Sequence, residues 1–317
     1  GGWTMRVPSL IGAGSMAIAS RSDPAKRGGV IINEHVLTAS ETRRHVDALS
    51  RWFDFIHHDD LLDRLARPKA RPFCLLTFDD GKRSFATQTA PELERLGVPA
   101  VIYVTTRFLT DRAPLWFDRR IAVERSLGYL PPEIKREILI QLPLASIAER
   151  LDRACDKYKV TVDTDDDDVG PMSWDEARDL ARRGFTIGAH SLRHAVLTCE
   201  TKASALSDIE QSIAEVSSEI GDPCKSFAFP NGNYTARLAR RALEAGAQTV
   251  MTTDPMWADN SFPPWRLPRV SLSGAYNRAA IELKMALATG RWLLNPNGTG
   301  RLYRKRSHAC ETPDANW

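Results

Sequence analysis

Two short clusters of side chains in this sequence have the types and spacing needed for metal-assisted chemistry. Asp79 and Asp80 are adjacent, and His190 and His194 are four residues apart. Histidines at this spacing can both reach one metal ion if the segment is helical or tightly turned, and two imidazoles with one carboxylate leave a coordination position open. The second carboxylate is then free to take a proton from a water molecule bound to the metal. This combination predicts metal-assisted hydrolysis.

Both clusters follow apolar runs that are typical of buried strands, residues 73–78 and residues 185–189. Each cluster also has a simpler explanation on its own. Asp80-Gly81 is an ordinary turn dipeptide, and the two histidines can be unrelated packing residues. However, the carboxyl ends of parallel strands are where α/β proteins place their sites, and Gly81 permits a tight turn that aims both carboxylates into one space. The joint pattern therefore favours a site.

Strands and helices alternate along most of the chain. The predicted strands are residues 55–56, 73–78, 98–105, 185–189, 225–229, 249–253 and 267–272. The predicted helices between and after them are residues 38–52, 59–65, 84–96, 173–183, 206–220, 235–245 and 276–288. This order predicts the α/β fold class and a single parallel barrel.

The chain divides into three parts by pattern. Residues 1–33 lack periodicity and are predicted to be irregular, residues 34–290 form the barrel, and residues 291–317 form a polar tail. Within the barrel, residues 107–170 break the strand–helix alternation and are predicted to be a helical insertion. The four aspartates at 165–168 lack the spacing of a calcium-binding loop and are expected to be solvated.

Composition excludes several function classes. The chain has 317 residues, a net charge of +3 and 43% hydrophobic residues, which is ordinary for a globular protein and too weakly basic to indicate nucleic-acid binding. It has no apolar run near eighteen residues, so no transmembrane segment is expected.

Five widely spaced cysteines without a Cys-x-x-Cys motif, and a poor leader sequence, favour a reducing, cytoplasmic location. An exported or periplasmic location is the alternative if the N-terminus has been trimmed. The oligomeric state is left open.

Three motifs in order resemble one protein family. They are Thr77-Phe-Asp-Asp-Gly81, His190-Ser-x-x-His194 and Phe227-Ala-Phe-Pro-Asn-Gly-x-Tyr234. Together they resemble the polysaccharide deacetylases of the NodB-homology type, carbohydrate esterase family four, and within it the Phe-Ala-Tyr-Pro branch. The similarity extends from about residue 36 to residue 272 and includes weaker signatures at 116–118, 173–174 and 266–269.

The resemblance implies a distorted (β/α) barrel of about seven strands that removes N-acetyl groups from an N-acetylated polysaccharide, oligosaccharide or glycan precursor. It implies a divalent metal, expected to be Zn²⁺, held by Asp80, His190 and His194. Asp79 then matches the general base that activates the metal-bound water. By the same resemblance, the backbone N–H of Asn231 contributes to stabilising the oxyanion.

The sequence departs from the family pattern in two places. Where many members carry an arginine that pairs with an acid and tunes the base, this chain has Phe227-Ala228, so Asp254 is expected to be the acid and Arg266 to supply the charge. Where a Leu-x-His motif normally supplies the general acid, this chain has residues 272–274, Leu-Ser-Gly. Three explanations remain open: Asp79 protonates the leaving amine, another residue does so, or the enzyme is slow.

Residues expected to contact the sugar are Pro230, Tyr234 and Trp265, with Trp116 and Trp257 as further aromatic candidates for stacking. Two rival functions remain: hydrolysis of another amide or ester in a substrate that is not a polysaccharide, and a catalytically impaired carbohydrate-binding barrel. The intact Asp79 argues against the second, since a binding protein has no evident need for a base.

Overall fold

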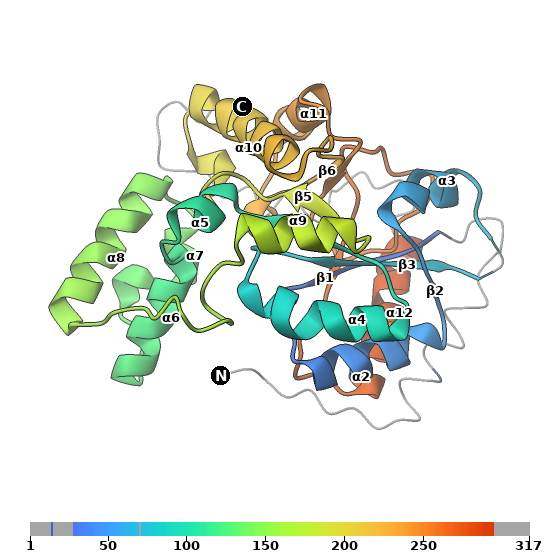
Figure 1. Cartoon of the computed structure of the whole chain (residues 1–317), viewed down its shortest axis with the longest axis horizontal. Coiled ribbons are helices and arrows are strands. Elements are labelled where there is room, and N and C mark those ends of the chain that lie inside the picture. The colour runs from blue at the N-terminus through green and yellow to red at the C-terminus, as the bar shows by residue number, and fades with distance from the viewer. Residues whose placement is uncertain (1–13, 15–27, 70, 295–317) are drawn as a thin grey trace.

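The computed structural model describes Gly14 and residues 28–69 and 71–294. Its centre is a parallel sheet (Figure 1). The strand order is β7-β6-β5-β4-β3-β1-β8, with β2 beside β3. The strands are β1 (Gly29–Glu34), β2 (Asp54–Phe55), β3 (Phe73–Phe78), β4 (Ala100–Val104), β5 (Thr186–Ala189), β6 (Ser226–Ala228), β7 (Thr249–Met251) and β8 (Val270–Ser271).

The two ends of the sheet come together through the segment just before β8. Leu267 N donates to Val250 O at 2.9 Å and Thr252 N donates to Leu267 O at 2.8 Å, which joins this segment to β7. Three residues later, Val270 pairs with Ile32 of β1. The same short stretch therefore bridges both edges of the sheet, and the predicted distorted (β/α) barrel of about seven strands is confirmed.

Two apolar clusters hold the barrel together. Alternate side chains of the strands point inward and pack with each other, among them Ile31, Leu75, Val101 and Met251. The side chains between them point outward and form the larger core against the surrounding helices. All six residues of β3 are buried, which explains why its sequence is apolar on both faces.

In the described part of the chain, seven helices surround the sheet. They are α2 (Ala39–Ser50), α3 (Leu61–Ala66), α4 (Ala90–Leu96), α9 (Trp174–Arg182), α10 (Lys202–Ile220), α11 (Ala236–Glu244) and α12 (Arg278–Leu294). Local sequence explains their ends. Ser173 and Glu176 form a capping box at the start of α9, and Gly97 and Gly221 end α4 and α10 in the left-handed conformation. A five-residue π-helix, Phe85–Thr89, precedes α4.

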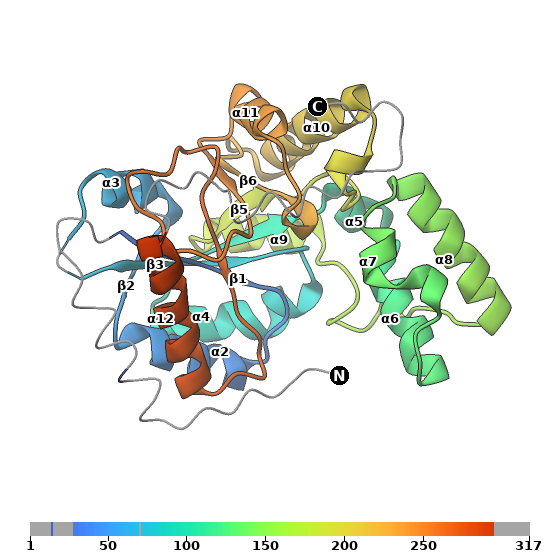
Figure 2. The same ribbon diagram turned by 180° about the vertical axis from the view of Figure 1, so that it is seen from behind.

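Four helices lie between β4 and α9, in the region predicted as the insertion: α5 (Thr106–Asp111), α6 (Trp116–Leu127), α7 (Arg136–Leu139) and α8 (Leu144–Tyr158). Figure 2 shows α6, α7 and α8 grouped beside the barrel. They pack around an apolar cluster that includes Val123, Ile147 and Leu151. The sequence analysis did not predict α6, whose apolar residues are spread around the helix and do not form one stripe.

The structure corrects both boundaries of the barrel. Residues 29–33 belong to strand β1 and not to an irregular segment. The strand was not predicted because two glycines come at its start and polar residues at its end, although all six of its residues are buried. At the other boundary, α12 continues to Leu294, beyond the predicted end at residue 290. The rest of both predicted terminal segments lies outside the described residues.

Cys74, Cys155 and Cys224 are free thiols. The expected cytoplasmic location stays a prediction. Among the described residues, no helix combines the length and apolar character needed to cross a bilayer.

Candidate active site

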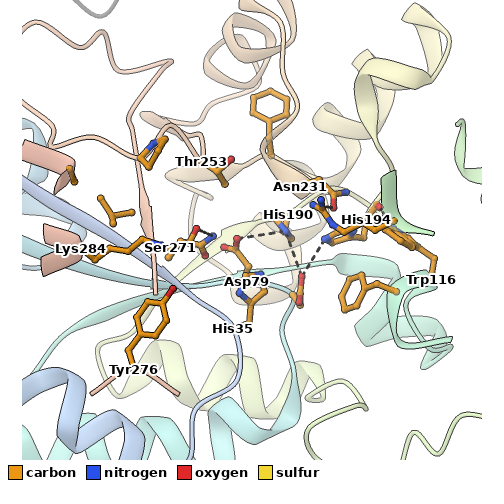
Figure 3. Close-up of a pocket in the computed structure, with 18 of the residues that line it drawn as sticks. His35, Asp79, Trp116, His190, His194, Asn231, Thr253, Ser271, Tyr276 and Lys284 are labelled. Carbon is orange, nitrogen blue, oxygen red and sulfur yellow. Dashed lines mark hydrogen bonds and ion pairs between the residues drawn. The ribbon is translucent and has the colours of Figure 1, made fainter. Parts of the chain in front are cut away.

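The carboxyl ends of the strands surround one cavity of about 750 Å³. Because the strands are parallel, the residues that follow β1, β3, β5, β6 and β7 all reach the same edge of the barrel. Asp79, Asp80, His190 and His194 line the cavity together with residues from the insertion and from α12 (Figure 3). The structure therefore brings together the two clusters that are more than a hundred residues apart in the sequence.

The backbone after β3 sends the two aspartates in different directions. Asp79 N donates to Glu34 O at 3.0 Å and so continues the β3–β1 ladder, whereas Asp80 has a φ of 78°. Gly81 follows with a φ of 83°, and a Cβ at this position would lie 3.0 Å from Leu109, so the turn requires glycine. As a result, adjacent carboxylates serve two separate groups of partners.

Asp80, His190 and His194 form one compact, buried cluster. Their ligand atoms all lie within 4.8 Å of one another, with His194 Nε2 3.4 Å and His190 Nε2 3.7 Å from Asp80 Oδ1. His190 Nδ1 lies 2.8 Å from Ala228 O. Since a carbonyl only accepts, Nδ1 carries the proton and the lone pair of Nε2 faces the cluster.

The electrostatics of the cluster suit a cation. Burial lowers the pKa of His190 to about 4, so this imidazole is neutral at neutral pH and able to act as a ligand. Burial alone raises the pKa of Asp80, but its close contact with His194 and the other nearby histidines hold that pKa below its ordinary value. Asp80 Oδ1 has no hydrogen-bond partner in the described part of the chain. A buried anion with an unused oxygen beside two imidazoles fits a divalent metal ion.

The loop that carries both histidines is fixed by contacts with three helices. Leu192 N donates to Asp208 of α10 at 3.1 Å, and Arg107 N of α5 donates to Leu192 O at 2.8 Å. Trp116 Nε1 of α6 donates to His194 O at 3.1 Å. These contacts hold the loop in a shape that includes a left-handed φ of 55° at His194.

The partner of the predicted base is an arginine that the sequence analysis did not choose. Arg269, which is fully buried, donates from Nη1 and Nη2 to the two oxygens of Asp79 at 2.7 and 2.9 Å. Burial raises the pKa of Asp79, but the charge of Arg269 outweighs it and holds the pKa below its ordinary value. Asp79 is therefore an ionised carboxylate in a fixed orientation.

The prediction that Arg266 serves the base is wrong. Arg266 lies 3.4 Å from Asp254, whose carboxylate also accepts a hydrogen bond from Tyr234 at 3.0 Å. The predicted pair of Asp254 and Arg266 thus exists, but it is not the ion pair that holds Asp79. The physical reason is the path of the chain, because Arg269 lies where the segment crosses from β7 to β1 and its side chain enters the barrel.

Asn231 lies at the edge of the cavity after β6. It has a left-handed φ of 56°, and its Oδ1 accepts a hydrogen bond from Arg136 Nη2 at 3.2 Å. The next residue, Gly232, has a φ of 75°, and a Cβ there would lie 1.8 Å from Thr253 Oγ1. The turn that presents Asn231 therefore depends on glycine at 232.

The predicted sugar-binding residues are placed differently from the expectation. Pro230 is buried, Tyr234 is bound to Asp254, and Trp265 packs against Arg240, so none of the three is among the residues that line the cavity. The aromatic residues that do line it are Trp116, Phe117, Phe229 and Tyr276. Trp257 is buried and donates to Met285 O at 3.0 Å.

Sequence reasoning missed His35, which lies beside Asp79 in the cavity (Figure 3). It is exposed and directly follows β1. His35 follows the end of a strand, as the two aspartates do, and the same rule would have identified it if strand β1 had been predicted. Three basic residues of the cavity wall were also missed: Arg120, Arg136 and Lys284. They come from the insertion and α12, where no short motif marks them.

Comparisons with known proteins agree with this geometry. A family model described as polysaccharide deacetylase matches residues 66–250, more than half of the chain. A search of curated proteins gave no match.

Several solved structures share the fold. The deacetylase PplD of Streptococcus pyogenes, in complex with acetate, has a TM-score of 0.58 at 13% identity, covering 83% of this chain and 99% of that one. The deacetylase domain of BpsB from Bordetella bronchiseptica has a TM-score of 0.55 at 16% identity, covering 80% and 98%. IcaB from Ammonifex degensii has a TM-score of 0.54 at 15% identity, covering 83% and 99%. At these identities the likeness concerns the fold.

Proposed function

Because the chain belongs to the polysaccharide deacetylase family, we propose that it is a metal-dependent hydrolase that removes N-acetyl groups from an N-acetylated polysaccharide, oligosaccharide or glycan precursor. The observation that carries this proposal is the division of labour between Asp79 and Asp80. One is oriented by Arg269 and the other faces two histidines, in the same cavity. The names of the structural neighbours, two of which are called deacetylases, support the same reaction class.

The cofactor in this proposal is a divalent cation, with Zn²⁺ favoured by the His-His-Asp donor set. When bound by Asp80, His190 and His194, it supplies Lewis-acid chemistry that polarises the acetamide and acidifies water. Asp79 takes the proton of the attacking water, since it is ionised and fixed by Arg269. The backbone N–H of Asn231 is proposed to donate to the oxygen of the tetrahedral intermediate.

We assign His35 as the general acid that protonates the leaving amine. β1 lies between β3, which carries Asp79, and β8, whose end lacks a histidine. His35 therefore reaches the cavity from the strand next to the one where a histidine was expected. As the carbon–nitrogen bond breaks, His35 gives a proton to the nitrogen and the amine leaves neutral. Loss of a general acid typically costs ~100- to 10,000-fold in rate.

The test is acetate release from N-acetylglucosamine oligomers of increasing length by the Zn²⁺-loaded protein. We expect release that is abolished by a chelator and by Asp79→Asn, and reduced at least 100-fold by His35→Gln with metal content unchanged. His57→Gln is the matched control, because this histidine lies outside the cavity lining and should have no effect. Acetate release that survives Asp79→Asn would overturn the mechanism, and tight glycan binding without any release would favour the carbohydrate-binding alternative.

A further inference from the structure

The walls of the cavity carry more positive than negative charge. Among the described residues that line it, Arg120, Arg136 and Lys284 are cationic, and the only acids are Asp79 and Asp80. Neither acid pairs with these cations, since Asp79 is paired with Arg269 and Asp80 faces the two histidines. Bound metal would add further positive charge. The lining itself therefore offers no carboxylate to balance its three cations.

Arg120 is held close to the metal-ligand loop. It lies one turn after Trp116 on α6, and Trp116 Nε1 donates to His194 O, which ties this helix to the loop. The side chain of Arg120 is 16% exposed, and Nη1 makes a 3.3 Å hydrogen bond with Glu124, which is outside the cavity lining. Its Nε is buried and has no acceptor in the described part of the chain. A largely desolvated guanidinium with an unused donor is a binding group for an anion.

Arg136 approaches the same wall from α7. Its Nη2 donates to Asn231 Oδ1 at 3.2 Å, which places its guanidinium beside the turn proposed to bind the oxyanion. Arg120 and Arg136 therefore both come from the insertion and flank the side of the cavity that holds His194 and Asn231. Lys284 lies on the other side, 5.5 Å from the ring of Tyr276 (Figure 3).

We propose that the substrate carries an anionic group, a carboxylate or a phosphate, close to the N-acetyl sugar that reacts, and that Arg120 and Arg136 bind it. This inference rests on the proposed function, because it names the substrate class of the same site. Guanidinium groups match the planar oxygens of carboxylates and the oxygens of phosphates, and the pairing is strengthened where water is partly excluded. A neutral glycan offers no anionic acceptor to the buried Nε of Arg120. The acidic group comes either from a uronic acid in the chain or from a phosphate ester on the sugar.

The test compares substrates that differ in charge. One is a neutral N-acetylglucosamine oligomer. The second is an oligomer in which N-acetylglucosamine alternates with glucuronic acid, together with its carboxyl-reduced form, and the third is N-acetylglucosamine 1-phosphate. The enzymes are the Zn²⁺-loaded wild type, Arg120→Gln, Arg136→Gln and the control Arg125→Gln. Arg125 is exposed on the same helix as Arg120 but lies outside the cavity lining.

We expect the wild type to prefer an acidic substrate over its neutral counterpart in kcat/KM. Arg120→Gln and Arg136→Gln should lower kcat/KM for the acidic substrate by roughly 10- to 100-fold, as for a lost charge-assisted hydrogen bond. Arg120→Gln should lower the ratio of kcat/KM on the acidic oligomer to that on the neutral one, and Arg125→Gln should change neither value. The uronic acid and phosphate arms identify which anion is bound.

Equal kcat/KM on acidic and carboxyl-reduced oligomers would overturn the inference and leave the deacetylase proposal standing. So would an equal loss on both substrates in Arg120→Gln. If no substrate releases acetate, the proposed function fails first, and calorimetric binding of the same oligosaccharides decides the inference. Tighter binding of the acidic form that Arg120→Gln removes would support it, and equal binding of both forms would refute it.

Discussion

Arg269→Met is the perturbation that tests the ion pair behind the proposed base. Arg269 is fully buried and makes four hydrogen bonds, two to Asp79, one to Thr77 Oγ1 at 3.1 Å and one to Thr252 O at 3.0 Å. Methionine has similar reach and no charge, so it leaves the Asp79 carboxylate, which is only 3% exposed, without a counterion. Breaking a buried pair in this way costs about 3–5 kcal/mol. We expect the free energy of unfolding to fall by that amount.

A double-mutant cycle separates the lost charge from the lost packing. Removing both charges in Asp79→Asn/Arg269→Met should recover most of the stability, because a neutral pair no longer carries an uncompensated buried anion. Arg266→Met is the matched control. It loses a 3.4 Å contact to Asp254, should cost about 1 kcal/mol, and should add to Asp79→Asn without coupling.

The assay is reversible unfolding in denaturant, in the presence of a chelator, followed by acetate release from the metal-loaded variants. Arg269→Met should lose activity and Arg266→Met should retain it. The reasoning is refuted if the double variant is no more stable than Arg269→Met alone. It is also refuted if Arg266→Met, and not Arg269→Met, shows the coupling to Asp79→Asn.

Three further predictions concern the supports of the site. Burial raises the pKa of Asp208 to about 7, so this residue costs stability as pH rises from about 4 to about 7. Asp208→Asn should remove that loss, gaining about 4 kcal/mol relative to wild type across this range in pH-dependent unfolding. A constant difference between the two proteins would contradict the assignment. Gly232→Ala should destabilise the protein by about 1–2 kcal/mol or more, because φ is positive there and the new Cβ would overlap Thr253. Gly184→Ala is the control with open space around it and should cost only the strain of its positive φ. Equal losses in the two variants would count against the close contact. Lys82 and Asp118 form a buried ion pair between the aspartate turn and α6. Lys82→Met should therefore lower the free energy of unfolding by about 3–5 kcal/mol, and Lys82→Met/Asp118→Leu by clearly less. If the double variant recovers no stability, the ion pair is not the cause of the loss.

The sequence predicted those parts of the fold that local patterns determine. Strand β3 has its predicted bounds, and α4 and α10 end at their predicted residues, 96 and 220, each before a glycine. The helix predicted at 173–183 is α9, which a capping box at Ser173 begins. Strand β1 was missed because its signal is short and its partners, β3 and β8, are distant in sequence. His35 was missed for the same reason, since a strand-end residue is found only after its strand.

The choice between Arg266 and Arg269 shows a second limit. Both are arginines of one short segment, and sequence spacing does not show which of them faces the barrel interior. That is decided by where the segment leaves β7 and joins β1, through the backbone bonds of Leu267 and the pairing of Val270. The sequence also could not predict the cavity wall formed by Arg120 and Arg136, because that wall depends on how the insertion packs against the barrel.

The central claim is that Asp80, His190 and His194 bind a metal ion while Asp79 acts as the base. The most direct test measures metal content and acetate release on the same samples of wild type, Asp79→Asn and His194→Ala. The account predicts one zinc ion per chain in wild type and in Asp79→Asn, with release only in wild type, and loss of both properties in His194→Ala. Full metal content and full release in His194→Ala, or loss of metal in Asp79→Asn, would contradict it.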